Sequence, residues 1–92
     1  MTDKEQVLAY LAEVQRMQME AYKIEITIES CTGRDDCWFR VVLQRAYDRY
    51  VFCFWSEYSE RENQREMERL RKVYNSLKPQ TNDNNNNSNN NS

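Results

Sequence analysis

The chain contains no histidine, one glycine and one proline. Without histidine it cannot form the Ser-His or Cys-His pair used in nucleophilic catalysis. With one glycine it has no glycine-rich loop to cradle a phosphate group. No apolar stretch approaches the roughly 20 residues of a membrane helix, and the N-terminus lacks the basic and then apolar order of a signal peptide. We therefore expect no catalytic residues, no cofactor and no membrane contact, and we expect a cytoplasmic protein with reduced thiols.

The chain also lacks an excess of charge of either sign. Its 13 basic and 15 acidic residues give a net charge of −2. Nucleic-acid-binding proteins usually carry a strongly basic face, so this balance argues against a nucleic-acid partner. The carboxylates of residues 57–68 are interleaved with arginine, a pattern typical of a solvated helix face.

The three cysteines raise the question of a disulfide or a metal site. Cys31 and Cys37 fall on opposite faces of the strands predicted below, and diverging thiols cannot form a bridge. With Cys53 on a separate strand and no histidine in the chain, the thiols make a poor zinc site. The neighbouring carboxylates Asp35 and Asp36 are typical of a solvated turn. We expect no metal, and we interpret the cysteines as small apolar residues.

Hydrophobic periodicity predicts five elements of secondary structure. Apolar residues recur at helical spacing over residues 3–21 and 57–77. Period-two alternation or a run of β-forming residues predicts three strands, over residues 22–30, 37–45 and 50–55. Ser59 and Glu62 form a possible capping box for the second helix, and Ser56 is an alternative N-cap.

The C-terminal residues differ from the rest of the chain. Residues 80–92 are rich in asparagine and contain no apolar side chain, so we expect them to be disordered. Pro79 marks the boundary, and residues 1–79 form a single small domain. A core of this size often needs a disulfide, a metal or a second subunit.

The alternation of side chains along the strands tests how they pair. A type II′ turn centred on Gly33-Arg34 places Ile28 opposite Phe39. A turn centred on Tyr47-Asp48 places Val41 opposite Phe54. Both hairpins then direct their isoleucine, valine, leucine and phenylalanine side chains to the same face. The prediction is an α+β fold of order α-β-β-β-α, in which a three-stranded antiparallel meander has both helices packed on one face.

The opposite face of this sheet is the candidate functional site. Its predicted rows are Lys23–Gln44–Val51, Glu25–Val42–Cys53 and Thr27–Arg40–Trp55, with Glu29 beside Trp38. Tryptophan and arginine are enriched at interface hot spots, and Arg40 is placed to stack on an indole. The candidate interface residues are Trp38, Arg40, Val42, Val51, Cys53 and Trp55.

Two interpretations of this face remain open. The tryptophans either shield one another beneath the stems of Arg40, Lys23 and Gln44, or they form a protein–protein surface. A homodimer is the simplest case, and a small regulator or inhibitor that docks on a larger protein is another. The last strand, residues 50–55, also ends the meander, so its free edge offers an alternative mode of association.

Nucleic-acid binding is the alternative function. The order α-β-β-β-α resembles that of double-stranded-RNA-binding domains, which present a basic cluster at the start of their second helix. Here that segment reads Ser56-Glu57-Tyr58-Ser59-Glu60-Arg61-Glu62, which would repel phosphate. The resemblance covers only the order of the elements.

Overall fold

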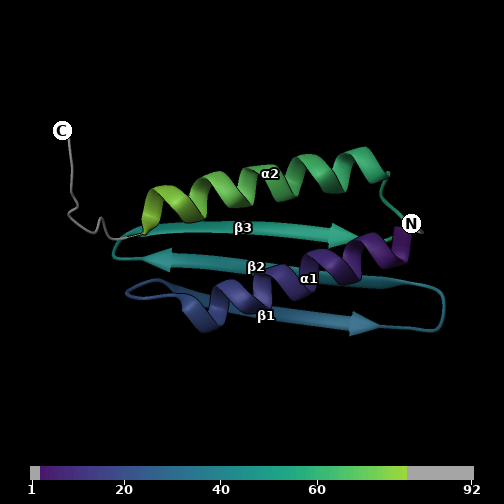
Figure 1. Ribbon diagram of the computed structural model, residues 1–92, viewed down its shortest axis with the longest axis horizontal. Helices are drawn as coiled ribbons and strands as arrows, with labels where there is room; N and C mark the ends of the chain where they lie inside the picture. The colour runs from purple at the N-terminus through teal and green to yellow at the C-terminus, as the bar shows by residue number, and fades with distance from the viewer. Residues whose placement is uncertain (1–2, 79–92) are drawn as a thin grey trace.

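The computed structural model describes residues 3–78, and the predicted disordered segment 80–92 lies outside the described residues. The elements are α1 (Asp3–Glu20), β1 (Glu25–Thr32), β2 (Cys37–Arg45), β3 (Asp48–Trp55) and α2 (Glu60–Leu77). The strands form one antiparallel sheet of order β1-β2-β3, and both helices lie over the same face of it (Figure 1). This confirms the predicted α+β meander. We call the face beneath the helices the inner face and the opposite one the outer face.

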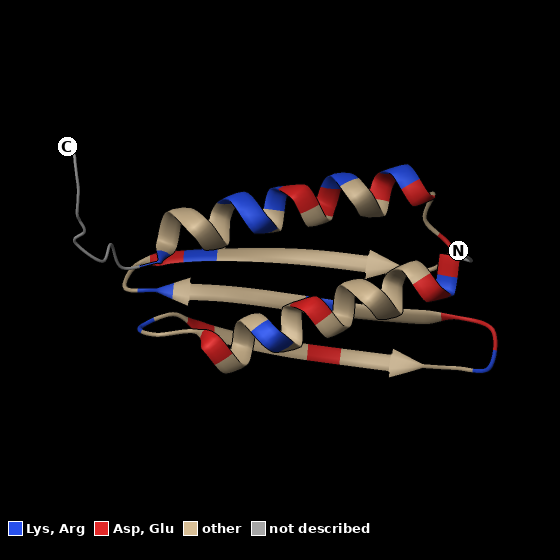
Figure 2. Ribbon diagram, viewed as in Figure 1, with Lys and Arg blue, Asp and Glu red and all other residues tan. Residues whose placement is uncertain are grey.

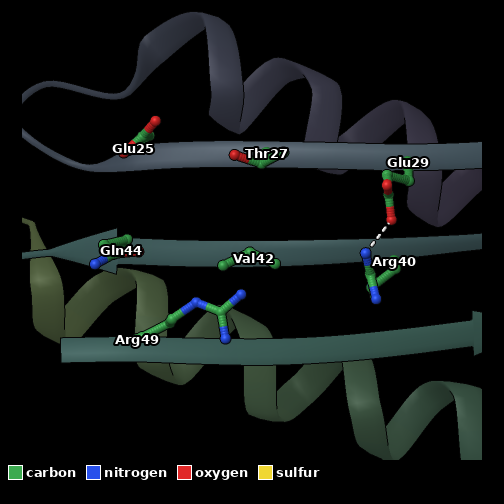
Figure 3. Close-up of a pocket in the computed structure, with 7 residues that line it drawn as sticks. All are labelled: Glu25, Thr27, Glu29, Arg40, Val42, Gln44 and Arg49. Atoms are coloured by element: carbon green, nitrogen blue, oxygen red, sulfur yellow. Dashed lines mark hydrogen bonds and ion pairs between the residues drawn. The ribbon is translucent and has the colours of Figure 1, made fainter.

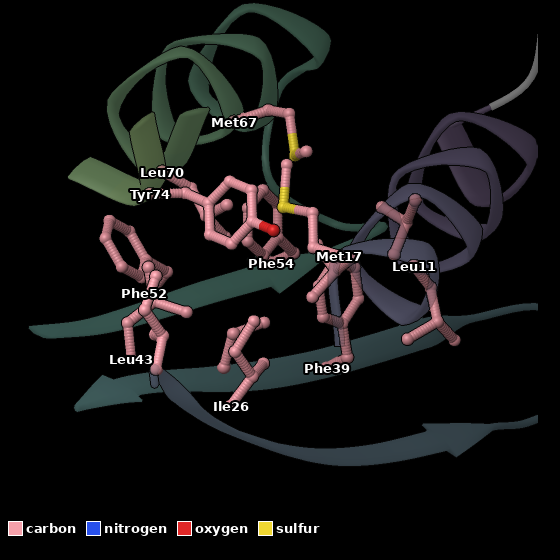
Figure 4. Close-up of a cluster of buried hydrophobic side chains, with 14 of the residues drawn as sticks. Leu11, Met17, Ile26, Phe39, Leu43, Phe52, Phe54, Met67, Leu70 and Tyr74 are labelled. Carbon is pink, nitrogen blue, oxygen red and sulfur yellow. The ribbon is translucent and has the colours of Figure 1, made fainter. Parts of the chain in front are cut away.

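The hydrophobic core fills the space between the helices and the inner face (Figure 4). At its centre the rings of Phe39 and Phe54 stack with centroids 4.4 Å apart and an interplanar angle of 10°. Leu43, Phe52 and Met67 are also fully buried. Burial of each such side chain contributes about 1.5–3 kcal/mol, so alternate residues of β2 and β3 hold the helices in place.

The first strand begins later than the sequence suggested. Lys23 has a φ of 64°, a left-handed conformation that no regular strand contains, and β1 begins only at Glu25. Tyr22, which alternation placed on the inner face, is exposed to 67 %. The prediction of a strand over residues 22–24 is therefore wrong, although Ile24 is buried as expected.

The first hairpin has a longer loop than predicted. Residues 33–36 form the loop, and Ile28 pairs with Val41 rather than with Phe39. The other predicted partners on β1 and β2 shift by the same two residues. Because a shift of two preserves the alternation, every side chain keeps its predicted face although the cross-strand partners were wrong.

Gly33 does not have the positive φ that a type II′ turn requires at this position. Its N–H donates to the carbonyl oxygen of Asp36 at 2.9 Å. A Cβ atom on Gly33 would lie 2.3 Å from Asp36 Oδ1. Lys4 Nζ on α1 donates to the carbonyl oxygens of Gly33 and Arg34 at 3.0 and 2.9 Å. The conformation of the loop thus depends on the close approach of Gly33 to Asp36 and on the hydrogen bonds from Lys4 of α1.

The second turn lies one residue earlier than predicted, at Ala46-Tyr47, and Val41 consequently pairs with Phe52 rather than with Phe54. Ala46 has a φ of 53°, whereas that of Tyr47 is not positive. A positive φ at the first central residue alone is the sign pattern of a type II′ turn. The positive φ that was expected in the first hairpin therefore occurs in the second.

The second helix begins at the predicted capping box. Ser59 Oγ accepts from the N–H of Glu62 at 3.0 Å, and Glu62 Oε1 accepts from the N–H of Ser59 at 2.9 Å. The alternative N-cap, Ser56, instead joins β3 to β2. Its hydroxyl accepts from the N–H of Cys37 at 3.0 Å, and its own N–H donates to the Cys37 carbonyl oxygen at 2.9 Å.

Side chains of α2 occupy the free edge of β3. Asn63 donates to the carbonyl oxygen of Trp55 at 2.9 Å and accepts from its N–H at 3.3 Å. Glu66 Oε2 accepts from the N–H of Cys53 at 3.0 Å, and Arg69 donates to the carbonyl oxygen of Val51 at 3.0 Å. Several backbone groups along this edge therefore already have partners among residues 3–78, which argues against the predicted pairing of this edge with another strand.

We expect Asn63→Ala to lower the free energy of unfolding by about 1–3 kcal/mol, because Asn63 is fully buried and its loss leaves two backbone groups of Trp55 without partners. Urea denaturation measures the change. Arg65→Ala, at an exposed position on the same helix, is the control and should change stability by less than about 0.5 kcal/mol. Equal effects of the two substitutions would contradict this role of Asn63.

An ion pair joins the two helices. Arg71 of α2 donates to both carboxylate oxygens of Glu13 on α1, at 2.8 and 2.9 Å. This hydrogen bonding holds the pKa of Glu13 below its usual value and raises the pKa of Arg71. The pair therefore stabilises the contact between α1 and α2 in the charged form of Glu13.

The stabilising effect of this pair should depend on pH. Because the folded-state pKa of Glu13 is lowered, its contribution is complete above the pKa of the unfolded chain, about 4.3, and is lost as the pH falls through the folded value. We expect Glu13→Gln to lower the free energy of unfolding at pH 7 by up to about 1 kcal/mol. The difference from the wild type should shrink as the pH falls below about 4.3 and disappear once Glu13 is protonated in the folded protein. A difference that keeps its pH 7 value on acidification would contradict the account.

Candidate functional site

The outer face carries every side chain that the sequence analysis assigned to an interface. These residues alternate along β2 and β3 with the buried side chains of the inner face, and no helix covers them (Figure 1). The residues placed there as predicted are Trp38, Arg40, Val42, Val51, Cys53 and Trp55.

One end of the outer face is aromatic. Trp38 lies directly opposite Trp55 on the neighbouring strand, and Trp38 is exposed to 40 %. The ring of Tyr58 meets that of Trp55 edge-on, with centroids 5.6 Å apart. Cys31 of β1 pairs with Trp38 on its other side. The predicted register did not bring the two tryptophans together, and it did not include Tyr58 or Cys31.

An ion pair crosses the middle of the outer face. Arg40 Nη2 donates to Glu29 Oε1 on the adjacent strand (Figure 3). Arg40 thus pairs with the carboxylate of Glu29, which lies opposite it on β1. The predicted role of Arg40 was to stack on an indole. Both side chains are about half exposed, 49 % for Arg40 and 55 % for Glu29, so the pair adds little to stability. It separates the aromatic end from the rest of the face.

The other end of the outer face is polar and forms a shallow hollow of about 200 Å³. Glu25, Gln44 and Arg49 make up its last row, and Thr27 lies beside Val42 in the row before. Figure 3 shows the Arg49 side chain extending over β3 toward Val42. The predicted rows had Lys23 and Val51 beside Gln44, so they missed Arg49. The earlier position of the second turn brings Arg49 beside Gln44.

The structure also tests the metal and membrane expectations. Residues 3–78 bring together no group of three or more cysteine, aspartate and glutamate side chains that could hold a metal ion. Over the same residues, neither helix has the length and apolar character needed to cross a membrane. Cys31 and Cys53 are exposed on the outer face while Cys37 is buried, so Cys31 and Cys37 do lie on opposite faces.

Comparisons with known proteins found no matching family model, no matching curated protein and no matching solved structure. The function is therefore argued from the outer face itself. Its distinctive features are the apposed tryptophans, the central ion pair and the opposite charges in the polar row.

The burial of Cys37 makes a prediction about thiol reactivity. In a Cys31→Ser/Cys53→Ser variant, the remaining thiol should not react with a maleimide reagent until urea unfolds the protein, because Cys37 is fully buried. Mass spectrometry counts the adducts. Adduct formation in the folded protein at the rate of a free cysteine would contradict the placement of Cys37 in the core.

Proposed function

We propose that this protein is a small, non-catalytic interaction module that forms a homodimer through the outer face of its sheet, in the cytoplasm. The observation that carries the proposal is the Trp38–Trp55 pair on a sheet face that no helix covers. Large aromatic side chains in such positions are typical of interface hot spots. The apolar surface continues from Trp55 along β3 through Cys53 and Val51, and Val42 of β2 lies beside Val51.

Face-to-face packing of two such sheets is physically reasonable. Stacked sheets lie about 10 Å apart with their strands within about 30° of alignment. Two-fold symmetry brings the same patch of both copies together, so the indoles of one copy would contact the aromatic end of the other. Burial of the outer face would also enlarge a core that is small for an independent domain.

The charges on the outer face support self-association. Glu25 and Arg49 occupy the two ends of one row, on β1 and β3. A two-fold axis parallel to β2 places β1 of one copy over β3 of the other, so Glu25 faces Arg49 across the interface in both directions. Glu29 and Arg40 already neutralise each other within each copy, which lowers the cost of bringing them together.

Nucleic-acid binding receives less support. Figure 2 shows lysine and arginine interspersed with glutamate along much of α2. Arg69 bonds to Glu66 and to the backbone of Val51, and Arg71 bonds to Glu13. Phosphate would have to compete with these partners.

Trp55→Glu tests the homodimer. A carboxylate in the centre of a desolvated aromatic contact is strongly unfavourable, so we expect the substitution to halve the mass of the assembly, measured by sedimentation equilibrium. Helix content by circular dichroism should not change, because Trp55 lies outside the core. Tyr47→Glu is the matched control, since Tyr47 is fully exposed at a hairpin tip away from the face, and it should leave the mass unchanged.

A wild-type protein that is monomeric at tens of micromolar would contradict the homodimer. The outer face would then favour docking on a different, larger protein. A Trp38→Ala/Trp55→Ala variant, which removes both indoles, is the control for detecting that binding.

A further inference from the structure

The two edges of the sheet differ in how their backbone groups are satisfied. Along β3, side chains of α2 bond to the backbone of Val51, Cys53 and Trp55. On the side of β1 away from β2, the only hydrogen bond to the backbone among residues 3–78 comes from Gln18 Nε2. It runs to the carbonyl oxygen of Ile26, at 2.8 Å. Among residues 3–78, the β3 edge therefore has several of its backbone groups occupied, whereas most of those on the β1 edge have no partner.

The orientation of the β1 backbone follows from the register. Backbone groups of successive residues in an antiparallel sheet point alternately toward the two sides of the strand. On β3 the odd-numbered residues bond to α2, so the even-numbered ones bond to β2. Carried across β2, the same alternation directs the odd-numbered residues of β1 to β2 and the even-numbered ones to the open edge. Ile26, whose carbonyl oxygen accepts from Gln18, agrees with this assignment.

The outward backbone groups of β1 without a partner among residues 3–78 lie between Ile28 and Thr32, and we call this segment the open run. Gln18 limits it at the Ile26 end, and the loop that begins at Gly33 limits it at the other. Strand β1 reads EITIESCT and contains no proline or lysine, the residues that commonly protect an edge from pairing. Its pairing with β2 is continuous from Glu25 to Thr32, without a bulge.

We propose that this run pairs with the same run of a second copy, antiparallel, about a two-fold axis that passes between the two Ser30 residues. Ser30 then lies opposite Ser30 of the second copy, and Ile28 lies opposite its Thr32. This interface is separate from the outer face and goes beyond the function proposed above. It joins the two sheets into one continuous sheet.

Two features favour this register: the charges of the side chains that it brings together, and the backbone groups that are free to form hydrogen bonds. With the axis at Ser30, Glu29 lies opposite Cys31 of the second copy. With the axis at Glu29, the two Glu29 carboxylates would oppose each other, which is destabilising. With the axis at Ile28, the pairing would need the backbone of Ile26, where the carbonyl oxygen already accepts from Gln18.

Apolar side chains near the open edge favour the same partner. Gln18 bonds to Ile26 of β1, and Lys4 bonds to Gly33 in the loop that follows β1. Leu8 and Leu11 lie between Lys4 and Gln18 on the same side of α1, at helical spacing. Leu8 is exposed to 37 %, and Ile28 is only partly buried. Rotation about an axis perpendicular to the sheet keeps the helices of both copies on one side, so each copy covers the exposed apolar groups of the other.

Ser30→Pro tests the edge directly. The Ser30 N–H points away from β2 and has no hydrogen-bond partner among residues 3–78, so proline removes only a bond to the second copy and is tolerated at such a position. Ser30→Ala, which keeps the N–H, is the matched control. We expect proline, and not alanine, to lower the mass of the assembly in sedimentation equilibrium, with the circular dichroism spectrum unchanged.

The same measurement separates this interface from the outer face. If both interfaces form, the β1 edges of two stacked copies lie on opposite sides, so the wild type assembles into an open chain whose mass rises with concentration. Ser30→Pro and Trp55→Glu then each give a dimer, and the double variant is a monomer. A mass that Ser30→Pro leaves unchanged would overturn the edge proposal. A mass that Ser30→Pro halves and Trp55→Glu leaves unchanged would support the edge and overturn the outer-face homodimer.

Disulfide trapping tests the register without relying on proline. In a Glu29→Cys variant, the new thiol should lie opposite Cys31 of the second copy, within bridging distance. Mild oxidation should then give a covalent dimer, and Glu29→Cys/Cys31→Ser should give none. Thr27→Cys, on the same face of the strand, is the positional control. Equal cross-linking of Thr27→Cys and Glu29→Cys would overturn the proposed register.

Discussion

The hydrogen bonds from α2 to the free edge of β3 are the constraint on which the rest of the structure depends. Asn63, Glu66 and Arg69 are spaced three residues apart on one side of the helix, and their side chains reach the backbone of the strand. They hold α2 against β3, so α1 packs beside it over the rest of the inner face. Both helices are then on one side, and the outer face has no cover from within residues 3–78.

The faces of the sheet were predictable because alternation along a strand is insensitive to a shift of two residues. Trp38, Val42 and Cys53 therefore lie on the outer face although their predicted cross-strand partners were wrong. The register was not predictable from the strands alone. The register of the first hairpin depends on the length of its loop, which Lys4 contacts from 29 residues away along the chain. The register of the second depends on a positive φ at Ala46, a conformation that alanine does not favour.

The errors in register concealed the most informative features of the candidate site. The observed pairing sets Trp38 against Trp55 and Glu29 against Arg40. The occupied edge of β3 was missed for a different reason, since it depends on where a folded helix places its polar side chains. Asn63 gave a signal in the sequence, because it lies four residues before Met67 on the apolar stripe of α2, where a buried amide needs partners.

The outer face and the β1 edge are the surfaces through which this small domain would extend its core. The central claim concerns the outer face, and the only two tryptophans of the chain, Trp38 and Trp55, both lie on it. Intrinsic fluorescence at increasing dilution therefore reports on that face directly. The account predicts an emission maximum that moves to longer wavelength as the assembly dissociates and the indoles become exposed to water. An emission maximum that stays constant while the measured mass falls, or a mass that stays monomeric throughout, would contradict it.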